Sequence, residues 1–259
     1  MLLLHTLGRN VHDRAWLLLH DSETLAPAAF AQFMAVCQRR MAGEPVAYIT
    51  GSKDFFGLNL MVDARVLDPR ADTETLVDWA LQTIEGTAMP QVLDLGTGSG
   101  AIALALAHAR PDAQVTAVDA SADALAVAQG NADRLGLPIR FVQGNWLETS
   151  PPLPGNFDLI VSNPPYIPDA DPHLAALTHE PRAALASGVD GLDDIRRIVA
   201  SAPAHLRFGG WLLLEHGHDQ AMAVRGLLRQ RGFSQPQSRQ DLAGIERCSG
   251  GHWPHGTEQ

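Results

Sequence analysis

The spacing of apolar residues differs between the first ninety residues of this chain and the remainder. Residues 1–43 have a helical pattern, and the clearest helix is predicted over residues 27–41, with Pro27 in its first turn and Gly43 at its end. The apolar side of that helix could line a groove for a partner, but core packing is its expected role. Its members are Phe30, Phe33, Met34, Cys37 and Met41.

A short hairpin and a further helix are predicted next. Residues 58–63 alternate with a period of two, which is typical of a strand buried on one face, and Gly51 and Gly57 bracket the preceding turn. The turn at residues 68–70 leads into a helix. Its predicted buried side consists of Leu76, Val77, Ala80, Leu81 and Ile84.

From residue 91 onward, strand patterns alternate with helical ones. Strands are predicted over residues 91–95, 114–119, 139–143, 157–162 and 211–215, and helices over 100–109, 122–135, 193–206 and 220–231. From residue 249 the chain is expected to finish as a strand end and a loose tail. The alternation predicts an α/β fold with a mostly parallel sheet covered on both faces. Ligands of such sheets bind beyond the carboxyl ends of the strands, so residues at those ends are the functional candidates.

Composition and charge narrow the class of partner. Acidic residues outnumber Lys and Arg by 29 to 19, whereas a protein that grips a nucleic-acid backbone needs a basic face. We therefore expect a protein or small-molecule substrate. Cys37 and Cys248 match no metal-ligand spacing, so we expect reduced thiols and no metal site. Because no apolar run has the length of a membrane span and the start lacks the basic region of a signal peptide, the expected location is the cytoplasm.

The most specific motif begins at Asp94 and continues through a glycine-rich turn into a helix. The turn consists of Gly96, Thr97, Gly98, Ser99 and Gly100. Glycine lets a ligand approach the backbone, and the helix start offers unpaired N–H groups. A dinucleotide fingerprint would place its third glycine at position 101, which is alanine. Asp94 suits the amino group of S-adenosylmethionine, and Asp119, at the end of the next strand, is placed to accept both ribose hydroxyls. We therefore predict a site for S-adenosylmethionine.

Trp146 follows the predicted strand 139–143, at the same edge of the sheet. Its ring could stack on an adenine base, or it could close the rim of the sheet by packing. The sequence leaves both roles open.

The strand 157–162 ends in Asn163, Pro164, Pro165 and Tyr166, which form the candidate acceptor site. The prolines stiffen the turn and keep Asn163 out of the helical region. The Asn163 side-chain carbonyl and a backbone carbonyl are two acceptors that suit one –NH2 group, with Tyr166 as a wall of the slot. Since a planar amide is a poor nucleophile, positioning must supply most of the catalysis, and no strong base is required. The loop predicts methyl transfer to a planar amide or amine nitrogen.

Together these motifs resemble those of the N5-glutamine methyltransferases, and specifically the release factor glutamine methyltransferases. Further matching stretches extend over nearly the whole chain, at residues 43–45, 48–51, 69–74, 171–174, 180–181 and 212–217. The resemblance implies a Rossmann-like class I S-adenosylmethionine-dependent methyltransferase fold, mostly parallel with seven strands, and a small helical N-terminal domain. It implies that class-1 peptide chain release factors are the partners, methylated on the glutamine of their Gly-Gly-Gln loop.

The same resemblance assigns residue roles. Cofactor contacts fall on residues 96–100, Asp119, Trp146 and Asn163, and the glutamine pocket on residues 163–166. We expect catalytic roles for Asn163, Pro164 and Tyr166.

The predicted organisation is a helical substrate-docking domain (1–45), a β-hairpin linker (46–70) and a methyltransferase domain (71–259). Ala71 stands where the family has a proline, which would loosen that loop but leaves Arg70 and Glu74. The chain also begins inside the family's N-terminal helical bundle, which implies either a trimmed bundle or a late start.

Three alternatives remain beside this interpretation. A sister enzyme that methylates a glutamine of a ribosomal protein would share the loop and the mechanism. An adenine-N6 DNA methyltransferase holds a flipped base in a similar loop, but it needs a basic cleft and a target-recognition domain, which this compact acidic chain does not offer. A catalytically silent module that only binds S-adenosylmethionine would not need the intact loop of residues 163–166, which we call the acceptor loop.

Overall fold

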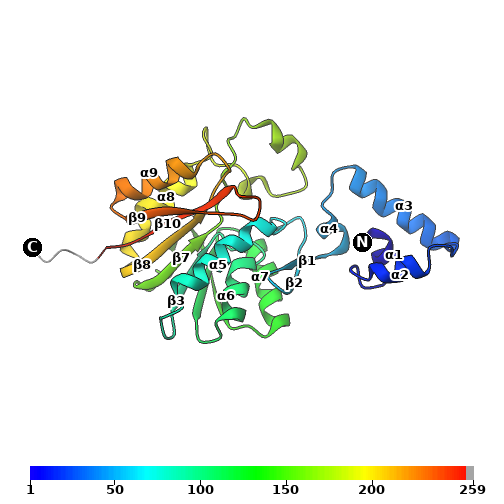
Figure 1. The fold of residues 1–259 in the computed structure, drawn as a ribbon, viewed down its shortest axis with the longest axis horizontal. Helices are drawn as coiled ribbons and strands as arrows, with labels where there is room; N and C mark the ends of the chain where they lie inside the picture. The colour runs from blue at the N-terminus through cyan, green and yellow to red at the C-terminus, as the bar shows by residue number, and fades with distance from the viewer. Residues whose placement is uncertain (255–259) are drawn as a thin grey trace, which may run out of the picture.

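The computed structural model describes residues 1–254, and its first part is helical. Helices α1 (Leu2–Thr6), α2 (Arg14–Leu19), α3 (Pro27–Met41) and α4 (Val46–Thr50) lie to one side of the main sheet (Figure 1). The antiparallel hairpin of β1 (Ser52–Phe55) and β2 (Leu58–Met61) connects them to it. The helix predicted over residues 27–41 and the hairpin are confirmed, whereas α4 is a helix at the start of the segment expected to be only a hairpin linker.

The apolar side of α3 is not packed in a core, so that expectation is wrong. None of its residues is buried: Phe30 is 53% exposed and Met34 is 41% exposed, and Met41 is exposed as well. The elements that mainly contact α3 are α1 and α4, which have only five residues each. Two such short helices present too little surface to cover the whole apolar side of a 15-residue helix.

Over residues 1–254 the main sheet has eight strands, in the order β6-β5-β4-β3-β7-β8-β10-β9. Neighbouring strands are parallel from β5 to β8, and β6 and β10 run antiparallel to their neighbours. The strands are β3 (Gln91–Leu95), β4 (Gln114–Asp119), β5 (Ile139–Asn145), β6 (Glu148–Thr149), β7 (Phe157–Ser162), β8 (Leu206–Glu215), β9 (Ser234–Gln240) and β10 (Glu246–His252).

The predicted parallel strands are confirmed, and the differences lie at their ends and at the sheet edges. β3, β4 and β7 have the predicted bounds, β5 runs on to Asn145, and β8 begins earlier, at Leu206. The eighth strand is the two-residue β6. β9 lacks an apolar alternation that could have predicted it, since an edge strand at the surface needs no buried side. Of the expected loose tail, residues 255–259 lie outside the described residues.

Helices cover both faces of this sheet, as predicted (Figure 1). On one face lie α5 (Glu74–Thr83), α6 (Ala101–Ala109) and α7 (Ala122–Leu135), and on the other α8 (Asp193–Ser201) and α9 (Ala221–Arg231). Short 3-10 helices are found at Ala71–Thr73, Pro172–Ala176, Arg182–Ala184 and Ala202–Ala204. None of the helices in residues 1–254 has the length and apolar character needed to cross a membrane.

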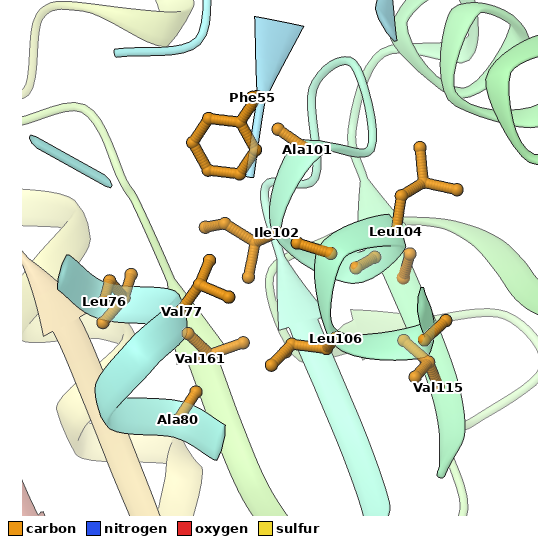
Figure 2. Close-up of a cluster of buried hydrophobic side chains, with 14 of the residues drawn as sticks. Phe55, Leu76, Val77, Ala80, Ala101, Ile102, Leu104, Leu106, Val115 and Val161 are labelled. Carbon is orange, nitrogen blue, oxygen red and sulfur yellow. The ribbon is translucent and has the colours of Figure 1, made fainter. Parts of the chain in front are cut away.

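Each face has its own core, and adjacent strand residues contribute to opposite ones. Val92 belongs to the core under α5 to α7, while Leu93 belongs to the core under α8 and α9. Figure 2 shows the first core, where Phe55 of the hairpin lies near Ala101 and Ile102 of α6. The hairpin is therefore packed onto the same helix that begins at the glycine-rich turn.

Candidate functional site

The candidate residues meet where the order of strands reverses. From β3 the chain continues to β4 and β5 on one side of the sheet and then returns to β7 on the other side of β3. Leu95 of β3 is the register partner of Ser162 of β7, so the glycine-rich turn and the acceptor loop leave the sheet side by side. Ligands of open α/β sheets bind at such a reversal.

A cavity of about 380 Å³ lies at this place, a size that suits a small organic ligand. It brings together the candidates Gly96, Gly98, Asp119, Trp146, Asn163 and Pro165. The other candidates do not line the cavity themselves. They are Asp94, Thr97, Ser99, Gly100, Pro164 and Tyr166. The cavity is also bounded by residues 65–67 and by Pro181, Ala183 and Ala184, which sequence analysis did not select.

The glycine-rich turn needs glycine for two physical reasons. Gly96, Gly98 and Gly100 all have positive φ angles, of 70°, 56° and 84°, which other residues adopt only with strain. A Cβ on Gly96 would lie 3.0 Å from Cζ3 of Trp146, and one on Gly98 would meet nothing within 4 Å. Gly98 therefore leaves open space where a ligand can approach the backbone.

Asp94 is fully buried beneath this turn. Its Oδ2 accepts hydrogen bonds from the Thr97 hydroxyl (2.6 Å) and the Ala103 backbone N–H (3.2 Å), whereas Oδ1 is buried without a partner. Burial raises the pKa of Asp94 to about 7. The side chain thus stabilises the turn with one oxygen and keeps the other unsatisfied, which is costly unless a donor reaches it.

Asp119 shapes the rim of the cavity from the end of β4. Its Oδ2 accepts a hydrogen bond from the Gly98 N–H, and its Oδ1 accepts one from the Ser121 N–H, each at 2.9 Å. These bonds hold the carboxylate in place, and its remaining lone pairs can accept from a ligand.

Trp146 packs against the glycine-rich turn, and its indole is held by Asp194, which also lines the cavity. Its Nε1 donates to Asp194 Oδ1 (2.9 Å), while Asp194 Oδ2 accepts from the Ser187 hydroxyl (2.8 Å). Trp146 itself has a φ of 57°, an unusual backbone conformation for a tryptophan. Since the ring lines the cavity and contacts Gly96, both predicted roles, a stacking surface and a rim plug, are compatible with its position.

The acceptor loop is tied to buried groups behind it. Asn163 Nδ2 donates to Thr73 Oγ1 (3.3 Å), and no other bond to the Asn163 amide accompanies it among the described residues. The Tyr166 hydroxyl donates to Glu215 Oε1 (3.3 Å). Burial and the Glu215 charge raise the pKa of Tyr166 above its usual range, so its hydroxyl stays protonated.

Sequence reasoning missed several residues that hold the site together, because they act over long sequence separations. Asn131 of α7 is buried; its side chain bonds both backbone groups of Met61 and the Ser99 carbonyl, so it connects the hairpin to the glycine-rich turn. Asp194 orients Trp146 in the same manner. The one signal in the sequence for Asn131 was an asparagine within the otherwise alanine-rich helix 122–135.

The raised pKa of Asp94 predicts a pH-dependent stability. An exposed Asp titrates near pH 4, so between that pH and about 7 the folded state binds more protons at this site than the unfolded state. The stabilisation from Asp94 is therefore complete below about pH 4 and is lost as the pH rises through about 7. Half-buried His205 and buried His216 have pKa values that burial lowers, and they act in the opposite direction, so a matched variant is required.

The quantity to measure is the free energy of unfolding of the wild type minus that of Asp94→Asn, without added ligand. We expect this difference to fall as the pH is raised from about 5 to about 8. Urea titrations at fixed pH values provide it. A difference that is constant or rises over that range would contradict the burial effect.

Comparison with known proteins first defines the class. Residues 72–230 match the Methyltransferase small domain family. Solved structures with a similar fold include a methyltransferase from Pyrococcus furiosus, with a TM-score of 0.59 and 19% identity over 84% of this chain and 100% of that chain. A 16S rRNA methyltransferase from T. thermophilus gives a TM-score of 0.58 and 21% identity, over 78% of this chain and 49% of the other. The fold is that of the class I methyltransferases.

Closer relatives then define the family. Residues 1–51 match the PrmC N-terminal domain. The chain is 52% identical to the release factor glutamine methyltransferase of Bordetella pertussis, over 97% of this chain and 93% of the relative. It is 51% identical to that of Xylella fastidiosa (strain Temecula1), over 98% and 91% respectively. The chain belongs to the release factor glutamine methyltransferase family.

Proposed function

We propose that this enzyme transfers a methyl group from S-adenosylmethionine to the side-chain amide nitrogen, N5, of the glutamine in the Gly-Gly-Gln loop of class-1 peptide chain release factors. The observation that carries the proposal is that one cavity is lined by both the glycine-rich turn and Asn163. A methyl donor and an acceptor amide can therefore meet within it. High identity to release factor enzymes over nearly the whole chain supports the choice of substrate.

The residues present fit S-adenosylmethionine. The unpartnered Oδ1 of Asp94 is a buried acceptor that the cofactor's ammonium group would satisfy, directly or through water. Asp119 can accept from the ribose hydroxyls, Gly98 leaves room beside the backbone, and Trp146 offers an aromatic face to the base. When bound, the cofactor supplies an electrophilic methyl group on a sulfonium.

Asn163 is the proposed binding group for the substrate amide. Because its Nδ2 is directed at Thr73, its Oδ1 is available to accept a hydrogen bond from the substrate –NH2. The Pro164 carbonyl, held in the stiff Pro-Pro turn, is the proposed second acceptor. Two acceptors orient the nitrogen and favour the build-up of positive charge on it, and the proton leaves after methyl transfer.

We propose that the N-terminal helices help to dock the release factor. The exposed apolar residues Phe30 and Met34 on α3 and Leu18 and Leu19 on α2 provide a surface that a protein partner could cover. The match of residues 1–51 to a domain characteristic of this family supports such a role. The net charge of -10 favours a protein over a nucleic acid as the direct partner. A cytoplasmic location belongs to the same proposal.

A comparison of three candidate substrates tests this function. The protein is incubated with methyl-labelled S-adenosylmethionine and, in parallel, with a release factor, a ribosomal protein and DNA, and the label is mapped by mass spectrometry. We expect label on the Gly-Gly-Gln glutamine alone, and none on a release factor in which that glutamine is replaced by asparagine. Label only on ribosomal protein, only on DNA, or on no substrate would refute the proposal.

A further inference from the structure

The acceptor loop is fixed by the sheet at its start, but its far end has to be held separately. Its first residue directly follows β7, which pairs with β3 on one side and β8 on the other. Proline fixes φ but not ψ, so Pro164 and Pro165 do not by themselves determine where Tyr166 lies. The direction of the Pro164 carbonyl, the proposed second acceptor, therefore depends on what holds Tyr166.

The side chain of Gln220, immediately before α9, holds this end of the loop. Gln220 is 8% exposed, and its Nε2 donates to the Tyr166 carbonyl (3.0 Å) and to the Asp190 carbonyl (3.2 Å). Its Oε1 accepts from the Gly217 N–H (2.8 Å). One buried amide thus connects the acceptor loop to two other segments of the chain, and we call these three bonds the Gln220 anchor.

The orientation of the Gln220 amide follows from its three partners. Two of them are carbonyl oxygens, which can only accept, and the third is a backbone N–H, which can only donate. A reversed amide would place its oxygen against both carbonyls and its –NH2 against the N–H, so all three bonds would be lost. Glutamine therefore meets every requirement of this position, whereas an ionised glutamate, which has nearly the same shape, cannot donate at all.

A close approach at Gly191 depends on the same arrangement. A Cβ on Gly191 would lie 2.1 Å from the Tyr166 carbonyl oxygen and 2.8 Å from Gln220 Nε2, and the φ of Gly191 is 74°. The bond between Gln220 and Tyr166 is therefore packed against a backbone position that only glycine can occupy. At its other end, Tyr166 donates its hydroxyl to Glu215 Oε1. Tyr166 is thus held both at its backbone carbonyl and at its hydroxyl.

We propose that Gln220 is a positioning residue for methyl transfer. By fixing the Tyr166 carbonyl, it sets the direction in which the acceptor loop presents the Pro164 carbonyl to the substrate –NH2. The inference rests on the proposed function of the acceptor loop. Gln220 lies outside the lining of the cavity and acts on the reaction only through the backbone of Tyr166. Its loss should therefore lower the rate of transfer and leave cofactor binding unchanged.

Gln220→Glu tests the proposal with little change in side-chain volume. We expect kcat for release factor methylation to fall about 100-fold, the effect that a misplacement of about 1 Å typically has on a positioned reaction. The Kd for S-adenosylmethionine should equal that of the wild type. Gln230→Glu is the matched control, because Gln230 lies in the last turn of α9, is exposed, and undergoes the same change of charge. Its kcat should equal that of the wild type.

The loss of kcat in Gln220→Glu should depend on pH. A protonated carboxyl can donate to one carbonyl and still accept from the Gly217 N–H, so it restores part of the Gln220 anchor. Burial beside two carbonyl oxygens raises the pKa of the introduced carboxyl above the value of about 4.3 for an exposed glutamate. We expect the kcat of the variant, divided by the wild-type kcat at the same pH, to rise as the pH is lowered from about 8 to about 6. Taking this ratio cancels the titration of the neighbouring His216 and Asp219, which are present in both proteins.

Gln220→Met keeps the proposal testable should Gln220→Glu fold poorly. Methionine has a similar length, brings no charge and cannot donate to either carbonyl, so we expect kcat to be lowered at every pH without recovery on acidification. Wild-type kcat in either variant would overturn the proposal. So would a kcat ratio in Gln220→Glu that does not change with pH. An equal loss of kcat in Gln230→Glu would overturn it too, because added charge would then explain the effect.

A measurement without substrate separates this inference from the proposed function. The free energy of unfolding of the wild type minus that of Gln220→Glu should grow as the pH rises from about 5 to about 8, because the introduced carboxyl binds its proton more tightly in the folded state. For Gln230→Glu this difference should change little. If the wild type methylates no release factor but the growth is seen, the proposed function fails and the Gln220 anchor stands. If the growth is absent, the anchor fails.

Discussion

Asn163→Ala is expected to abolish methyl transfer while most of the affinity for S-adenosylmethionine remains. The side chain supplies the proposed acceptor Oδ1, and alanine leaves the substrate –NH2 without this partner and free to rotate. Removing one preorganised hydrogen-bonding group from an active site typically lowers kcat by about 100- to 1000-fold. We expect a loss at the upper end, because orientation is the main catalytic device available to this loop.

Three measurements on Asn163→Ala together check this result. Single-turnover methylation of the release factor gives the rate of transfer, isothermal titration gives the cofactor Kd, and thermal unfolding reports on the fold. Asn163 is only one of several residues around the cavity, so Kd should change far less than the rate. Undiminished turnover would remove Asn163 from the mechanism. A Kd that weakens in proportion to the rate would reassign Asn163 to cofactor binding.

Asp119→Ala is expected to have the converse effect, a large loss of cofactor affinity. The variant loses a carboxylate that can accept ribose hydroxyls, and it also frees the backbone N–H groups of Gly98 and Ser121. Hydrogen bonds to a charged group contribute about 1.5–3 kcal/mol each, so we expect S-adenosylmethionine to bind roughly 100-fold more weakly. At saturating cofactor, the rate of transfer should recover much of its wild-type value.

Asp123→Ala is the matched control for Asp119→Ala. Asp123 lies in the first turn of α7, is exposed, and is not part of the cavity lining, but its removal changes the net charge by the same amount. Its Kd should equal that of the wild type. If both variants weaken binding equally, a general charge effect explains the result. If neither does, Asp119 has no part in holding the cofactor.

Local sequence signals predicted several single strands and helices of this protein correctly. The strands Gln91–Leu95 and Phe157–Ser162 have the bounds that their apolar runs predicted, and α7 (Ala122–Leu135) likewise. These elements are determined locally, because alternation or helical spacing and the residues at their ends are all contained in a short window. Helical spacing also predicted the bounds of α3 correctly, but it did not predict that none of the residues of α3 is buried. Spacing reports which residues share a face, but not whether another element covers it.

The sequence alone determined which residues can form a sharp glycine turn and which can form a proline-stiffened acceptor loop. It also determined which carboxylate stands at the end of a strand. These properties are intrinsic to glycine, aspartate and proline. Only the tertiary structure decided that Gly96 and Asn163 line one cavity, because the pairing of β3 with β7 joins segments that are far apart in the chain. It alone also brought Thr73 and Glu215 behind Asn163 and Tyr166. The chemistry of a side chain is a local property, whereas its hydrogen-bond partner depends on how the sheet is assembled.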